Sequence, residues 1–174
     1  MITRRIPWTQ PWSTALITAC LGLLPYLGNA QIAAWEFAGN AGTEVTVAAS
    51  TLDANLQATS VSRGPGIAAS GLTNSFSSTG FTASGDQTNA VTNGNYFQFS
   101  IASQSGFEVS LSTLDVTFRR SSTGPNAFQW QYSLDGFGTA GVDIGGNFSY
   151  TGSGGNGQLQ TQIDLSSITA LQGV

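Results

Sequence analysis

The sequence predicts an all-β protein: an antiparallel β-sandwich, jelly-roll-like, that follows an N-terminal signal peptide. Three observations indicate this class. Apolar and polar residues alternate over short runs between residues 32 and 165, which is the period of a half-buried strand. Turn-forming glycines separate these runs, and no stretch of about twelve residues has apolar positions at helical spacing. About eight short strands joined in this way are typical of a sandwich.

Seven runs carry the alternating pattern, and each predicts a strand. In chain order they are 32–37, 43–49, 95–103, 107–111, 114–120, 128–134 and 158–165. Asn-Gly and Asp-Gly pairs mark tight turns, because these residues accept positive φ angles; the pairs are Asn93-Gly94, Asp135-Gly136 and Asn156-Gly157. The glycine-rich residues 145–157 are predicted to form a surface loop that flanks a short strand at 148–150.

Residues 114–120 and 128–134 are predicted to be the two arms of a hairpin. Arg120 continues the apolar phase of the first arm, so it leaves the core where that arm ends. Its guanidinium is expected to lie on an aromatic ring of the returning arm, Trp130 or Tyr132. An arginine pair that binds an anionic sugar or a phosphate is the alternative interpretation of this stretch.

The N-terminal segment has the pattern of a secretory signal peptide. Arg4 and Arg5 precede an apolar run, and small residues lead to a predicted cleavage site after Ala30. A transmembrane helix is one alternative, but Pro25 and a run of roughly half the ~20 residues that a span needs argue against it. Acylation of Cys20, in the lipobox-like "ITAC", is a second alternative.

Residues 31–174 are then one β-sandwich domain, long enough to bury a core without disulfides. Two of the five basic residues lie in the signal peptide, so three positive and nine negative charges remain, a net charge of −6. Such a surface repels phosphate backbones, and no nucleic-acid partner is expected. The chain has no histidine, and its one cysteine lies in the signal peptide. Nucleophilic triads and the usual zinc, copper and haem sites are therefore excluded, and we expect a non-catalytic domain.

Calcium is the one metal that this residue set permits, because it takes oxygen ligands alone. The candidate ligands of a structural Ca²⁺ are Asp86, Asp135 and Asp143, although none lies in the spacing of a dedicated calcium loop. Paired carboxylates for glycoside hydrolysis are conceivable, but most of the acidic residues lie in turn-like contexts or on the outward phase of strands.

Sugar binding needs an exposed aromatic platform with amides or carboxylates beside it. Aromatic residues within the strand phase are expected to face the core. The glycan-binding candidates are therefore the three aromatic residues outside that phase: Phe81, Phe137 and Tyr150. Extracellular polysaccharide or other surface proteins are the expected partners.

Four stretches together resemble a family of bacterial exported domains. They are "AAWEFAGNAG", "TLDANLQATSVSRGPGIA", "NGNYFQFSIASQSGFEVSLSTLDVTFRRSSTGP" and "FQWQYSLDGF". Members of this family follow a signal peptide and often end in a PEP-CTERM-type sorting segment; no catalytic residues are established for them. The resemblance covers nearly all of residues 33–171 and implies a secreted or cell-surface location.

The resemblance also implies that the sandwich is incomplete at the C-terminus, since such domains continue with further strands after a segment similar to "IDLSSITALQGV". The residues agree, because Ile168, Leu171 and Val174 begin an apolar pattern with no predicted partner strand. The expected function is a structural or adhesive role in an exported surface or extracellular-matrix protein. An accessory module of a secreted enzyme, whose catalytic domain is absent here, and a carbohydrate-binding module are the alternatives.

Overall fold

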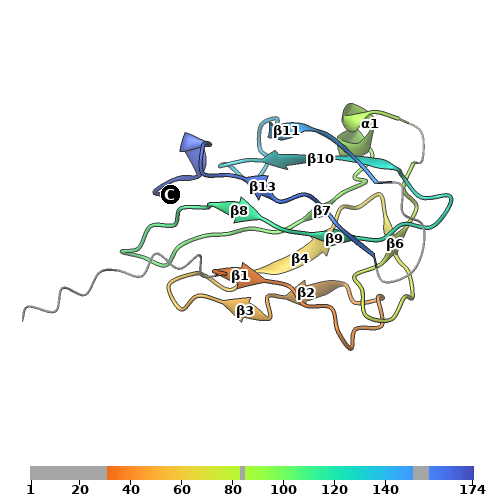
Figure 1. The fold of residues 1–174 in the computed structure, drawn as a ribbon, viewed down its shortest axis with the longest axis horizontal. Coiled ribbons are helices and arrows are strands. Elements are labelled where there is room, and N and C mark those ends of the chain that lie inside the picture. The colour runs from red at the N-terminus through yellow and green to blue at the C-terminus, as the bar shows by residue number, and fades with distance from the viewer. Residues whose placement is uncertain (1–30, 83–84, 151–156) are drawn as a thin grey trace, which may run out of the picture. The chain divides into compact units, whose positions relative to one another are not determined.

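The computed structural model describes residues 31–82, 85–150 and 157–174. The signal-peptide prediction for residues 1–30 and part of the predicted glycine-rich loop, 151–156, lie outside these described residues. The described part consists of antiparallel strands with one short α-helix and one 3-10 turn (Figure 1), which confirms the all-β class. The jelly-roll order of its strands stays a prediction. None of its helices has the length and apolar character that crossing a membrane requires.

The strands are short, and backbone hydrogen bonds beyond their ends prolong most of the pairings. In chain order the elements are β1 Ala33–Ala34, β2 Thr46–Ala48, β3 Thr51–Leu52, β4 Ser60–Arg63, β5 Ala68–Ala69, β6 Ser78–Thr79, α1 Gln87–Thr92, β7 Phe97–Gln98, β8 Thr113–Leu114, β9 Thr117–Phe118, β10 Ala127–Tyr132, β11 Val142–Ser149, β12 Gln158–Leu159, β13 Ile163–Asp164 and the 3-10 turn Thr169–Leu171.

The first half of the chain pairs within itself. β2, β4 and β7 form a three-stranded antiparallel sheet, β1 pairs with β3, and β5 pairs with β6. The β4–β7 pairing continues in both directions, through bonds from Gln57 N–H to the Ala102 carbonyl (2.8 Å) and from Gly66 N–H to the Gly94 carbonyl (3.0 Å). β3 to β6 were not predicted, because strands made mostly of Ser, Thr and Ala show no apolar alternation.

A close approach of two backbone segments fixes the end of β4. A Cβ added to Gly66 would lie 1.7 Å from the carbonyl oxygen of Asn93, in backbone that cannot easily move. We therefore expect Gly66→Ala to lower the free energy of unfolding by about 1–3 kcal/mol in chemical denaturation. A Cβ on Gly146 meets nothing within 4 Å, so Gly146→Ala is the matched control, with an expected change under about 1 kcal/mol. Equal losses in the two variants would contradict the steric explanation.

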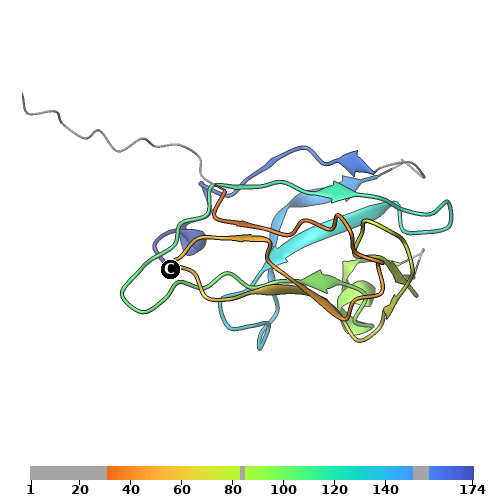
Figure 2. The ribbon, with the colours of Figure 1, turned by 90° about the horizontal axis from the view of Figure 1, so that it is seen from below.

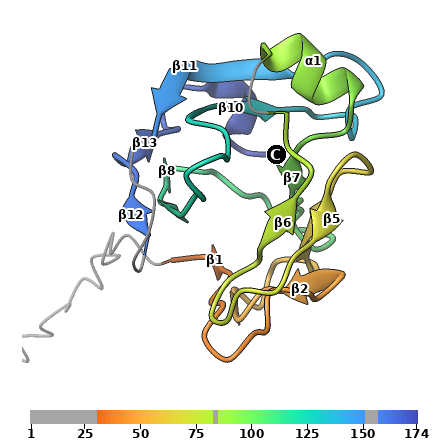
Figure 3. The same cartoon turned by 90° about the vertical axis from the view of Figure 1, so that its right-hand side faces the viewer.

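The second half of the chain also pairs within itself, and its pairs are nested. β8 and β9 pair with β13 and β12, while β10 pairs with β11 between them in sequence. Leu114 lies opposite Ile163, and the pairing continues to the last residue, where Val109 and Val174 exchange two backbone hydrogen bonds of 2.8 and 3.1 Å. Figure 2 shows the C-terminal strands running along β8 and β9. In Figure 3, β1, β2, β5 and β6 lie together, apart from β10, β11 and β13.

The predicted hairpin of residues 114–120 with 128–134 is wrong. β9 pairs with β12 and β10 with β11, so the two segments share no backbone hydrogen bonds among the strand pairings. They meet through side chains instead, since the rings of Phe118 and Phe128 lie 4.4 Å apart. The physical reason is that the apolar side chains of both segments face the same core without the segments being neighbours in a sheet. The backbone partner of β9 is β12, about 40 residues further along the chain.

The core of this half collects residues from both nested pairs. Ile144, Ile163, Leu165 and Leu171 are buried in one cluster. The prediction that Leu171 lacks a partner strand is wrong, because residues 171–174 pair with residues 109–111. The sequence did not show this pairing, since the two segments lie about 60 residues apart along the chain. Half-buried residues pack against the cluster: Leu111, Leu114, Trp130, Tyr132, Phe148 and Ile168.

The helix α1 was not predicted either. Asp86 is its N-cap and accepts a hydrogen bond at 2.9 Å from the backbone N–H of Asn89. Gly94, with φ +69°, follows the C-cap residue Asn93, so this Asn-Gly pair ends a helix instead of joining two strands. α1 buries no residue, which explains why apolar spacing did not reveal it.

Candidate functional site

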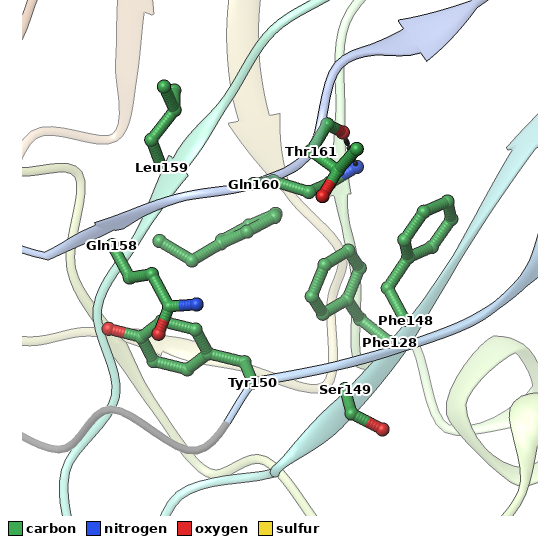
Figure 4. A pocket seen from close by; sticks show the side chains of 9 residues that line it. Phe128, Phe148, Ser149, Tyr150, Gln158, Leu159, Gln160 and Thr161 are labelled. Atoms are coloured by element: carbon green, nitrogen blue, oxygen red, sulfur yellow. Dashed lines mark hydrogen bonds between the residues drawn. The ribbon is translucent and has the colours of Figure 1, made fainter.

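A hollow of about 110 Å³ lies where the β10–β11 hairpin meets β9 and β12. We name it the Tyr150 pocket. Figure 4 shows its lining, which contains no charged residue. The lining residues are Phe118, Phe128, Phe148, Ser149, Tyr150, Gln158, Leu159, Gln160 and Thr161.

An irregularity in the β10–β11 hairpin builds one side of this pocket. The register shifts after Phe128, so that β11 carries extra residues, and Gly145 there has a φ of +65°. The side-chain amide of Gln129 donates to the carbonyls of Ile144 (3.1 Å) and Gly145 (3.3 Å), which compensates for hydrogen bonds that the bulge removes from the ladder. The bulge places Phe148 beside Phe128.

Three phenylalanine rings form the apolar wall of the pocket. The Phe128 ring stacks on that of Phe148, with centroids 5.5 Å apart and an interplanar angle of 12°. The Phe128 ring also contacts the Phe118 ring, with centroids 4.4 Å apart. Each ring comes from a different strand, so the wall depends on the pairing of the whole second half of the chain.

Polar side chains lie beside the rings. Trp130 Nε1 donates to Gln160 Oε1 at 3.2 Å, which orients the amide of Gln160. Tyr150 is only 6% exposed, and its hydroxyl has no hydrogen-bond partner among the described residues. A buried hydroxyl without a partner costs about 1–3 kcal/mol. In Figure 4 the Tyr150 side chain extends away from Phe128 and Phe148, so that its hydroxyl lies on the side of Gln158, and Leu159 points away from the rings.

The three predicted glycan-binding aromatics do not come together in this structure. Phe81 is half-buried against the ring of Phe97, 5.6 Å away. Phe137 is 49% exposed in the turn between β10 and β11, with a left-handed φ of +63°. Tyr150 lines the pocket but is buried, so the expectation of an exposed platform is wrong for it. Tyr150 directly follows β11, an eight-residue strand where mainly a loop was predicted, and its N–H bonds to the Asn126 carbonyl at 2.8 Å, which continues the β10–β11 ladder and holds Tyr150 in the fold.

The sequence did not point to the phenylalanines and glutamines of the pocket. Phe118 and Phe128 were assigned to the core on strand phase, which is right for the direction of their side chains. Their pocket exists because β12 is the partner of β9, and this pairing leaves no local trace in the sequence. Alternation of Gln with apolar residues at 158–160 was the one available signal.

The three calcium candidates each have a local role. Asp86 caps α1, and Asp143 accepts hydrogen bonds from two glutamine amides, one of them on α1. Asp135 accepts from the hydroxyls of Ser133 (2.6 Å) and Thr139 (2.8 Å) within its own turn. In residues 31–82, 85–150 and 157–174, no three acidic, histidine or cysteine side chains gather at one point.

The predicted stacking of Arg120 on Trp130 or Tyr132 is wrong. Arg120 instead donates to the carbonyl of Gly124, at 2.6 and 3.1 Å, and so closes its own loop. The cation–π contact in the described part belongs to Arg63, whose guanidinium carbon lies 3.6 Å from the centre of the Phe76 ring. The guanidinium of Arg120 is occupied by loop carbonyls, which disfavours an arginine pair that binds an anion.

A second hollow, of about 250 Å³, brings Asp53 and Glu108 together. Phe107, 52% exposed, lies on its rim, and Asp53 accepts a hydrogen bond at 2.8 Å from the N–H of Asn55. The sequence placed these carboxylates in separate contexts, a turn and an outward strand position. Only the tertiary structure shows that they line one hollow.

Hydrogen bonds lower the pKa of four exposed carboxyls below their ordinary values of 3.8 to 4.5. The largest cause is the residue's own backbone N–H for Glu44, Ser133 for Asp135, Gln87 for Asp143 and Ser166 for Asp164.

The lowered pKa values of these four carboxyls predict how the stability of the fold depends on pH. A lowered pKa in the folded state contributes stability above the unfolded pKa, and this contribution is lost as pH falls through the folded pKa. We therefore expect a melting temperature that is nearly constant from about pH 8 to 5 and that falls below about pH 4. Thermal unfolding at a series of pH values checks this, and Asp164→Asn should weaken the acid dependence. A step in stability between pH 5 and 8 would contradict it, since the chain has no histidine.

Comparison of the chain with protein-family models, with curated proteins and with solved structures finds no match. The two hollows and the carboxylates are the features of the described part that bear on function.

Proposed function

We propose that this chain is an exported, non-catalytic domain with a structural or adhesive role at a bacterial surface or in an extracellular matrix. It resembles exported domains of PEP-CTERM-type proteins, and its N-terminal segment has the pattern of a cleaved signal. The polar, weakly charged exterior suits a protein that contacts neutral polymers or other surface proteins.

One observation carries the non-catalytic part of the proposal. Seven of the nine carboxylates accept hydrogen bonds from uncharged donors, mostly in their own turns: Glu44, Asp53, Asp86, Asp115, Asp135, Asp143 and Asp164. Four of them have a lowered pKa. A general acid in glycoside hydrolysis needs the opposite, a raised pKa. Five of these seven carboxylates accept hydrogen bonds within their own turns, and Asp115 and Asp143 connect their strand to other segments through glutamine amides.

Export is tested on the full chain in a bacterial host. The expected result is a secreted or surface-bound product whose first residue is Gln31, measured by mass spectrometry of the N-terminus. Ala30→Arg, which alters the predicted cleavage site, should retain residues 1–30. An acylated product that starts at Cys20 would replace the cleavage prediction, and an intact chain in the cytoplasm would overturn the proposal.

Catalysis is tested on the same exported protein. Among the described residues no group donates a hydrogen bond to the Glu108 carboxylate, and Glu108 lines the larger of the two hollows, so it is the best remaining candidate for an acid. We expect no release of reducing ends from soluble polysaccharides above the level of a protein-free control. A hydrolysis rate that disappears in Glu108→Gln would show that the domain is an enzyme.

The gene sequence beyond the codon of Val174 separates a surface protein from an accessory module. A Pro-rich spacer, an apolar span and terminal arginines would support surface anchoring. New motifs of histidine, cysteine or clustered acidic residues would favour an accessory module of a secreted enzyme.

A further inference from the structure

We propose that the turn between β10 and β11 carries an open platform for a neutral polysaccharide, with the ring of Phe137 stacked on one sugar of the polymer. The inference deepens the adhesive role proposed above and rests on it, because it names the class of polymer to which the domain adheres. It follows from the exposure of the ring, from the backbone conformation that holds it and from the polar side chains beside it.

The ring of Phe137 is presented to solvent by a backbone conformation that its own residue type disfavours. Phe137 is 49% exposed and has a φ of +63°, in the left-handed region that costs a residue with a side chain roughly 1–2 kcal/mol. A glycine would make the same turn without this cost. The fold alone therefore gives no reason for a phenylalanine here, whereas a ligand that covers the ring does.

Hydrogen bonds fix this turn before any ligand binds. The N–H of Phe137 donates to Ser133 Oγ at 2.8 Å, and the Ser133 hydroxyl donates to the Asp135 carboxylate at 2.6 Å. The hydroxyl of Thr139 donates to the other oxygen of that carboxylate at 2.8 Å. A ring that is already held in place loses little conformational freedom on binding, which favours affinity.

Gly141 brings the ring beside two polar side chains of the hairpin. A Cβ added to Gly141 would lie 2.7 Å from Cε1 of Phe137 and 3.3 Å from Cβ of Gln131, so the ring and Gln131 meet over this glycine. The amide of Gln131 donates to the carboxylate of Asp143, its partner in the ladder, at 2.9 Å. Asp143 projects outward, because the next residue, Ile144, is buried in the core.

The ring and these polar groups are the two surfaces that a sugar requires. A pyranose presents C–H groups on its faces and hydroxyls around its edge, so it binds to an aromatic ring with hydrogen-bonding groups beside it. Among the described residues, no group donates to Oδ2 of Asp143 or to Oε1 of Gln131, so both oxygens are free to accept from sugar hydroxyls.

Charge and openness restrict the ligand to a neutral polymer. The carboxylates of Asp135 and Asp143 lie near the ring in the fold and repel an anionic sugar. Phe137 lines neither of the two hollows described above, so the inner sugars of a long chain can reach it. Leu134, 66% exposed, and Val142, 52% exposed, flank the turn and extend its apolar surface.

The test is an NMR titration of the exported protein with cellohexaose, xylohexaose and laminarihexaose up to about 5 mM. At least one of them should give saturable shifts of the backbone N–H of Phe137 and of the side-chain amide of Gln131. The expected dissociation constant is on the order of 0.1–1 mM, as for a site with few contacts, and it should not change in about 0.5 M NaCl. Hexagalacturonate, which is anionic, should bind at least about tenfold more weakly.

Substitutions of Phe137 separate a role in binding from a role in the fold. Phe137→Gly removes the ring and accepts the positive φ, so it should unfold at about the same denaturant concentration as the parent and lose binding. Phe137→Tyr should bind within about threefold of the parent, whereas Phe137→Leu, which is apolar but cannot stack, should weaken binding about tenfold. Phe107→Ala removes a ring of similar exposure in another loop, 52%, and is the control that should bind like the parent.

Three results would overturn the inference: no saturable shift with any of the three neutral oligosaccharides, equal binding by the parent and Phe137→Leu, or tighter binding of hexagalacturonate. An exported protein that binds none of the oligosaccharides would reject the platform and leave the export proposal standing. A protein that binds one of them but remains in the cytoplasm would reject the export proposal alone.

Discussion

Replacing Leu165 by alanine should lower the free energy of unfolding by about 2–5 kcal/mol. Leu165 is 4% exposed and belongs to the buried cluster with Ile144, Ile163 and Leu171. Alanine leaves a cavity that the paired backbone around it cannot close, because the N–H of Leu165 is bonded to the Ser112 carbonyl at 2.8 Å. Urea denaturation with linear extrapolation measures the change.

Leu159→Ala is the matched control. It makes the same chemical change six positions earlier in the same C-terminal segment, but Leu159 is 67% exposed. We expect a change within about 0.5 kcal/mol. If both leucine variants lose little stability, the C-terminal segment does not belong to the folded core, and the pairing of β12 and β13 with β9 and β8 is not maintained in solution.

Arg63→Ala should cost about 2–4 kcal/mol, from the loss of charged hydrogen bonds and of the ring contact. Arg63 donates to Ser78 Oγ at 2.6 Å and to the carbonyl of Ser77 at 2.7 Å. It also donates to the carbonyls of Gly42 and Glu44, so its guanidinium connects three separate segments of the first half. Burial lowers the pKa of Arg63, and the negative charge of Glu44 partly offsets this.

Two further variants identify the cause of that loss. Arg63→Lys keeps the charge but replaces a planar fork by a single ammonium group, so it should recover less than half of the lost stability. Arg119→Ala removes an exposed arginine and should change stability by no more than about 0.5 kcal/mol. A full recovery by lysine would show that the charge alone matters, against the multi-point contact seen here.

The first of these predictions bears on the candidate site, because Leu165 supports one wall of the Tyr150 pocket. The Leu165 cluster includes Phe148 among the residues packed against it, and Phe148 is part of the wall of the Tyr150 pocket. A variant that unfolds this cluster would therefore also disturb the wall of the pocket.

Part of the fold could be read from local patterns. The alternation over 114–120 predicts which side chains point inward, and Leu114, Val116 and Phe118 are indeed less exposed than their neighbours Asp115 and Thr117. Such a pattern works because successive side chains of a strand point to opposite faces. Positive φ at glycines after Asn or Asp was also predictable, and Gly94, Gly136 and Gly157 all show it.

The pairing of the strands could not be read in this way. Strand phase is the same whichever partner a strand takes, so residues 114–120 carried no mark of their partner at 158–165. The role of Arg63 was equally hidden, because its contacts come from segments 14 to 21 residues away. The adjacent Arg119 and Arg120 suggested a binding site or a ring contact, whereas Arg120 bonds to the carbonyl of Gly124 in its own loop.

The sequence by itself determined the all-β class, the inward phase of its apolar strands and the absence of histidine chemistry, because each of these depends on residue identity or on neighbours along the chain. Only the tertiary structure decided the strand partners, the contacts of Arg63 with distant segments and the Tyr150 pocket. The physical reason is that a pocket forms from side chains on strands distant in sequence, here β9, β10, β11 and β12, and their meeting depends on the packing of the whole domain.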